Sequence, residues 1–134
     1  MVEGKAQGVA AARARVLLVE DEADIRELIR YSLMQGGFEV EEASDGAEAL
    51  DKLRTFAPDL VVLDLMLPGM LGLEVCRLLR LRTDTAGLPI LIVSAKSNAS
   101  DKATGLAMGA DDYVTKPFSP RDLLERAIAL LPRR

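Results

Sequence analysis

The chain has 134 residues, enough for one domain, and 49% of them are hydrophobic but only 4% aromatic, so its core must be aliphatic. Its net charge of -4 argues against direct binding to nucleic acid, and its apolar runs are too short to span a membrane. The absence of histidine excludes histidine-ligated zinc sites, while the one cysteine, Cys76, excludes an internal disulfide and fits a reducing cytosol.

Short apolar runs alternate with segments whose apolar residues recur at helical spacing. In chain order, the sequence predicts strands at 16–19, 38–43, 60–63, 90–93 and 113–114, each followed by a helix, at 24–34, 47–53, 73–81, 101–108 and 122–131. Continuous rather than alternating apolar residues indicate strands buried on both faces. This order predicts an α/β fold: a doubly wound parallel sheet of five strands with helices on both faces.

Residues 1–14 mix charged and small residues before the first strand. They contain no apolar stretch of the kind found in a signal peptide. We expect a disordered N-terminal lead-in over 1–14 and one domain over 15–134.

Polar side chains follow four of the strands, at the point where each strand ends. They are Glu20 and Asp21, Asp64, Ser94, and Lys116. Because the carboxyl ends of parallel strands lie at one edge of a sheet, these groups are expected to converge there. Clustered carboxylates repel one another, and a hard cation such as Mg²⁺ (or Mn²⁺), which prefers oxygen ligands, relieves that repulsion.

Phosphoryl transfer to a carboxylate is the chemistry that suits this set. Asp64 would act as the nucleophile, and Mg²⁺ and Lys116 would neutralise charge on the phosphoryl oxygens. Ser94 could donate a hydrogen bond to the phosphoryl group. Taken singly, each residue has a plainer interpretation, as a solvated turn, a helix cap or a surface lysine. Their shared position at the strand ends favours a single site.

Four motifs resemble the receiver domain of bacterial response regulators, over 15–131 of this chain. They are VLLVEDE at 16–22, LDLMLPG at 63–69, SAK at 94–96 and GADDYVTKPF at 109–118. The residues of these motifs are similar to those of the OmpR/PhoB-type branch, whose members carry a winged-helix DNA-binding domain. The resemblance implies a flavodoxin-like fold with strand order 2-1-3-4-5 and five helices.

The resemblance also implies a role for each site residue. Asp64 is the phosphoacceptor, paired with Lys116, and a sensor histidine kinase is the phosphoryl donor. Asp21, Asp64 and the backbone carbonyl of Met66 bind Mg²⁺, and Glu20 acts through bound water. A cytoplasmic signalling switch is implied rather than an enzyme, with only self-phosphorylation from small phosphodonors and self-dephosphorylation.

The resemblance further implies a conformational switch in which phosphorylation leads to homodimer formation. Ser94 and the aromatic Tyr113 are the switch residues, and the bond before Pro117 is cis. Phosphorylation is expected to change the face formed by the helix at 101–108, the strand at 113–114 and the helix at 122–131. On that face, homodimers would form through cross-subunit charge pairs, for which the candidates are Lys102 with Asp122 and Asp112 with Arg126.

Two other functions compete with this interpretation. Phosphatases of similar fold use a nucleophilic aspartate with a second aspartate two residues later, but Met66 occupies that position here. A degenerate receiver would serve only as a binding module, which the intact set of acidic residues, Ser94 and Lys116 disfavours.

Overall fold

The computed structural model describes residues 13–131, so most of the predicted lead-in and the last three residues of the predicted domain lie outside the described residues. Five strands alternate with five helices. In chain order they are β1 (Arg15–Val19), α2 (Ala23–Gln35), β2 (Glu39–Ala43), α3 (Gly46–Lys52), β3 (Leu60–Leu63), α4 (Gly72–Leu81), β4 (Ile90–Ser94), α5 (Ala99–Ala107), β5 (Asp112–Thr115) and α6 (Pro120–Leu130).

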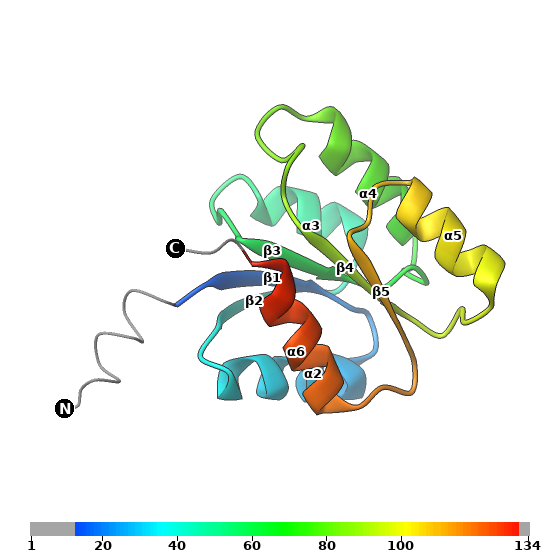
Figure 1. Cartoon of the computed structure of the whole chain (residues 1–134). Coiled ribbons are helices and arrows are strands. Elements are labelled where there is room, and N and C mark those ends of the chain that lie inside the picture. The colour runs from blue at the N-terminus through cyan, green and yellow to red at the C-terminus, as the bar shows by residue number, and fades with distance from the viewer. Residues whose placement is uncertain (1–12, 132–134) are drawn as a thin grey trace.

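The strands form one parallel sheet in the order β2-β1-β3-β4-β5, which confirms the predicted fold class and strand order. Helices α2 and α6 cover one face of the sheet, and α3, α4 and α5 cover the other (Figure 1). The three central strands are buried along their whole length or nearly so, as their continuous apolar sequences predict. Within residues 13–131, no helix is long and apolar enough to cross a membrane.

Both faces of the sheet carry an aliphatic core. On the face of α2 and α6, Ile29 and Leu33 pack with Leu123 against β1 and β3. On the opposite face, Val75 and Leu79 of α4 lie among residues of β3 and β4. The strands are therefore fixed from both sides, so that their carboxyl ends form a rigid platform for the residues that follow them.

Three helices begin at capping residues. Asp45 accepts a hydrogen bond from the amide of Glu48, Asn98 from that of Asp101, and Ser119 from that of Asp122. For α5 and α6 the caps place the helix start two residues before the predicted one, because the prediction followed the apolar periodicity rather than the cap. The Lys116–Pro117 bond is cis, as the resemblance implies.

Candidate functional site

Three carboxylates converge at the carboxyl edge of the sheet. Glu20 and Asp21 directly follow β1, and Asp64 directly follows β3, the strand that pairs with β1. One carboxylate oxygen from each lies within 4.8 Å of the others. Glu20 and Asp64 are almost fully buried, whereas Asp21 is exposed. The site thus combines two buried acids with one that faces solvent, a set of oxygen ligands suited to Mg²⁺.

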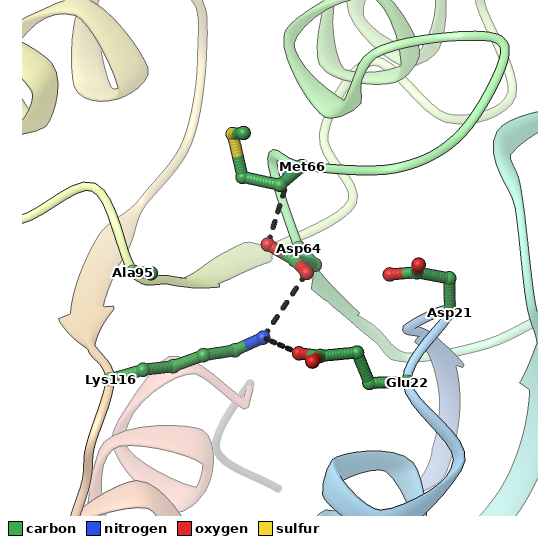
Figure 2. A pocket seen from close by; sticks show the side chains of 6 residues that line it. All are labelled: Asp21, Glu22, Asp64, Met66, Ala95 and Lys116. Atoms are coloured by element: carbon green, nitrogen blue, oxygen red, sulfur yellow. Dashed lines mark hydrogen bonds and ion pairs between the residues drawn. The ribbon is translucent and has the colours of Figure 1, made fainter.

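Lys116, which follows β5, supplies the positive charge of the site. Its Nζ lies 3.0 Å from Glu20 Oε1, 3.2 Å from Asp64 Oδ2 and 3.5 Å from Glu22 Oε1. Figure 2 shows the ammonium group between Asp64 and Glu22. Burial favours a lower pKa for Lys116, but the close contact with Glu20 and the charges of both buried acids outweigh it and raise the pKa. Lys116 is therefore a fixed cation at neutral pH.

Glu20 provides the test of whether the site fits a metal ion. Burial raises its pKa, and the nearby Lys116 offsets only part of that rise. Within the described part of the chain, its buried Oε1 has no well-aligned hydrogen bond, although Lys116 Nζ is close. One ammonium group faces three carboxylates, so the cluster remains short of positive charge. A divalent cation that brings its own water ligands fits this arrangement.

The loop after Asp64 forms one side of an open pocket. The amide of Met66 donates to Asp64 Oδ1 at 3.1 Å, and this bond orients the carboxylate (Figure 2). The pocket is lined by Asp21, Glu22, Asp64, Met66, Ala95 and Lys116. Glu22 and Ala95 were not among the predicted site residues. Their only signal in the sequence was adjacency to predicted ones, because a side chain next to a strand end can turn toward the site or away from it.

Ser94 does not lie on the wall of the pocket. It is fully buried at the end of β4, where its Oγ accepts a hydrogen bond from the amide of Lys96 at 3.1 Å. Ala95, the next residue, lines the pocket in its place. Ser94 is thus close in sequence to the pocket wall but engaged with its own loop.

Tyr113 is turned inward. Its side chain is buried, and its hydroxyl donates to the carbonyl of Lys96 at 2.7 Å. Burial raises the pKa of this hydroxyl, and the nearby Ser94 side chain offsets part of the rise. The ring packs against Gly105 of α5, where an added Cβ would lie 3.0 Å from Cε2 of the tyrosine. Both predicted switch residues therefore contact the same loop after β4.

Three of the four residues predicted for a dimer face, Lys102, Asp122 and Arg126, line one hollow on α5, β5 and α6, and the fourth, Asp112, contacts Arg126. Within one chain, Arg126 Nη1 lies 2.9 Å from Asp112 Oδ2, and its Nε donates to Asp122 at 3.0 Å. No ion pair involves the side chain of Lys102 within residues 13–131. Asp112 and Arg126, which were predicted to pair between subunits, therefore form an ion pair within one chain in this structure.

Known proteins are similar to this chain in sequence and in fold. The family model described as the response regulator receiver domain matches residues 16–128. The alkaline phosphatase synthesis transcriptional regulatory protein PhoP of Bacillus subtilis is 50% identical over 119 residues, which cover 89% of this chain and 49% of that protein. The DNA-binding response regulator MtrA of Mycobacterium tuberculosis is 46% identical over 121 residues, 90% of this chain and 52% of that protein.

Solved structures agree with these matches. A response regulator from Chloroflexus aurantiacus superposes with a TM-score of 0.87 at 36% identity, over 90% of this chain and 99% of that one. The chemotaxis response regulator CheY4 of Vibrio cholerae gives a TM-score of 0.84 at 34% identity, over 89% and 99%. The chain spans about half the length of the curated relatives it matches, but nearly all of these two structures.

Proposed function

Since this chain belongs to the response regulator receiver family, we propose that Asp64 is its phosphoacceptor and takes the phosphoryl group from a sensor histidine kinase. The observation that carries the assignment is the position of the Asp64 carboxylate. It is buried beside two further carboxylates and a lysine, yet it lines a pocket open to solvent. A donor can reach Asp64, while the groups that stabilise the transferred charge are already in place.

We propose the following roles in the transfer. An oxygen of Asp64 attacks phosphorus in line with the leaving nitrogen of the kinase phosphohistidine, so that a P–O bond forms as the P–N bond breaks. Bound Mg²⁺ would neutralise phosphoryl charge, held by Asp21, Asp64 and the Met66 carbonyl, with Glu20 acting through water. Lys116, already at Asp64 Oδ2, pairs with the arriving phosphoryl oxygens.

The proposed switch follows from the added charge. Ser94 would exchange its bond with the Lys96 amide for one with the phosphoryl group, and the loop after β4 would move with it. Because the Tyr113 hydroxyl is bonded to the Lys96 carbonyl, that movement would reach the face formed by α5, β5 and α6. The curated relatives are named as transcriptional or DNA-binding regulators. We propose that this cytoplasmic receiver, over 15–134 with 1–14 as a lead-in, controls such an output without itself binding DNA.

Intact-protein mass spectrometry tests the proposal. After incubation with acetyl phosphate and Mg²⁺, the protein should gain the mass of one phosphoryl group. With a chelator in place of Mg²⁺, the gain should disappear, because the phosphoryl charge is then not neutralised. Uptake that is indifferent to the chelator would contradict a metal-dependent site, and no uptake under any condition would favour a degenerate binding module.

Met66 should make the aspartyl phosphate long-lived. Its exposed side chain lines the pocket and has no group that could orient an attacking water. The residue two positions after Ser94 is Lys96, which is also neither an acid nor an amide. Met66→Asn should accelerate self-dephosphorylation by about tenfold or more, measured as the decay of the phosphorylated mass. Leu71→Asn, a change of an equally exposed apolar residue outside the pocket, is the control. Equal decay in all three proteins would contradict this account.

The α5-β5-α6 face should support dimers in which charge pairs exchange between subunits. Arg126 already binds Asp112 and Asp122 within the chain, so a dimer would replace these bonds by equivalent ones across the interface. With a phosphoryl mimic, sedimentation velocity should show a shift toward dimer. In Arg126→Ala the dimer dissociation constant should rise by about tenfold or more. Arg121→Ala, on the exposed side of the same helix, should behave as wild type. A wild-type protein that stays monomeric with the mimic would remove the dimer from the proposal.

A further inference from the structure

Arg26, in the first turns of α2, connects the loop that carries the acidic pair to strand β2. Its Nη1 donates to the carbonyl oxygen of Glu20 at 2.7 Å and lies 3.4 Å from the carbonyl oxygen of Asp21. Its Nε donates to Glu42 Oε1 at 3.2 Å. The Arg26 side chain is largely covered, with 22% of it exposed. One planar group therefore holds two consecutive backbone carbonyls and is itself held by a carboxylate.

The orientation of Asp21 depends on the contacts that Arg26 makes with the loop, because no contact within residues 13–131 fixes the Asp21 side chain itself. Its carboxylate is exposed, and within residues 13–131 it forms no hydrogen bond or ion pair; Figure 2 shows it pointing into the pocket on its own. The helix that follows offers little help, since its N-cap residue, Glu22, makes no capping bond with its side chain. The direction of the Asp21 carboxylate is therefore set by the backbone of the loop, and Arg26 holds that backbone.

We propose that Arg26 is a positioning residue for the metal site, fixing the Asp21 carboxylate toward Asp64 through the carbonyls of Glu20 and Asp21. The inference rests on the proposed Mg²⁺ site and adds a residue that does not touch the ion. Glu42 takes part indirectly. It binds Arg26 through one oxygen, and this bond keeps the Arg26 guanidinium directed at the loop. Its other oxygen binds Arg30 at 2.8 Å.

The direction in which Mg²⁺ affinity changes when Arg26 is removed distinguishes a positioning role from a purely electrostatic one. Arg26 carries a positive charge near a cation site, so if charge were its only influence, its removal would strengthen Mg²⁺ binding. If Arg26 positions the loop, its removal lets Asp21 leave the productive direction and weakens Mg²⁺ binding. Groups that orient metal ligands usually change metal affinity by about tenfold or more when they are removed.

Calorimetric titration with Mg²⁺ of the unphosphorylated protein tests the proposal. We expect the dissociation constant of Arg26→Gln to rise by about tenfold over wild type. Arg26→Lys should rescue this only in part, because an ammonium group keeps the charge but cannot span both carbonyls and Glu42. Arg30→Gln is the matched control: it removes a neighbouring arginine that binds the same glutamate but touches neither carbonyl, and its affinity should match wild type.

Amide hydrogen exchange of the metal-free protein gives a second readout. In Arg26→Gln the amides of residues 20–24 should exchange faster while those of the central strands keep their wild-type rates. Equal or tighter Mg²⁺ binding by Arg26→Gln, with unchanged exchange in the loop, would overturn the inference. If wild type itself binds no Mg²⁺, the proposed metal site is wrong, and the exchange rates alone then decide whether Arg26 holds the loop.

Discussion

Asp64→Asn should fold normally and take up no phosphoryl group from acetyl phosphate and Mg²⁺. The amide of asparagine is not a nucleophile at neutral pH, and the other two carboxylates of the cluster are assigned to the metal rather than to attack. In the mass assay, wild type should gain one phosphoryl group and the variant none. Asp21→Asn should remain competent but slower by about tenfold or more, because it loses a proposed metal ligand rather than the proposed acceptor.

The stability of Asp64→Asn separates lost chemistry from lost structure. Three carboxylates face one ammonium group at this site, so removing one negative charge relieves repulsion in the metal-free protein. The thermal midpoint of the variant without Mg²⁺ should therefore equal or exceed that of wild type, and Mg²⁺ should raise it less. Asp84→Asn, which changes an exposed aspartate paired with Arg82, should keep full uptake. If Asp64→Asn still took up a phosphoryl group, the acceptor would have to be another residue.

The positions of the strand ends could be predicted because they depend on local sequence. The apolar run at 60–63 must be a buried strand, and parallel pairing then brings Asp64 next to the residues after β1. The same reasoning placed Lys116 at this edge, and the structure puts its ammonium group between Asp64 and Glu20. Sheet topology therefore brings the backbones that carry these groups to one edge.

Side-chain direction could not be predicted from the sequence. Ser94 and Ala95 are neighbours at the end of β4, yet Ala95 lines the pocket while Ser94 is buried. Arg126 could equally reach a second subunit or its own strand, and in this structure it binds Asp112 of the same chain. Arg26 gave no signal at all, because its contacts with the loop are with backbone carbonyls, which every residue possesses.

Gly72, at the start of α4, is a further position that the sequence did not mark as part of the site. A Cβ added there would lie 2.7 Å from the Cα of Leu65 and 3.0 Å from the carbonyl carbon of Asp64. These are backbone atoms, so no rotamer change can relieve the overlap. The Gly72 amide also donates to the carbonyl of Leu65 at 3.1 Å. Helix α4 can approach the loop after β3 this closely only through a glycine.

Gly72→Ala should therefore destabilise the protein by about 3 kcal/mol, near the upper end of the usual range for overpacking. Urea denaturation should show this as a lower midpoint with an unchanged slope. Gly87→Ala is the control, since an added Cβ there meets no atom within 4 Å and its stability should change by less than about 1 kcal/mol.

The folded fraction of Gly72→Ala should also accept phosphate more slowly than wild type. Moving α4 away from the loop shifts the Asp64 backbone, and with it the carboxylate that the Met66 amide orients. Rates should be compared at a temperature where both proteins are fully folded, so that lost stability does not imitate lost positioning. If Gly72→Ala matched Gly87→Ala in both stability and rate, the close approach of α4 would have no part in holding Asp64.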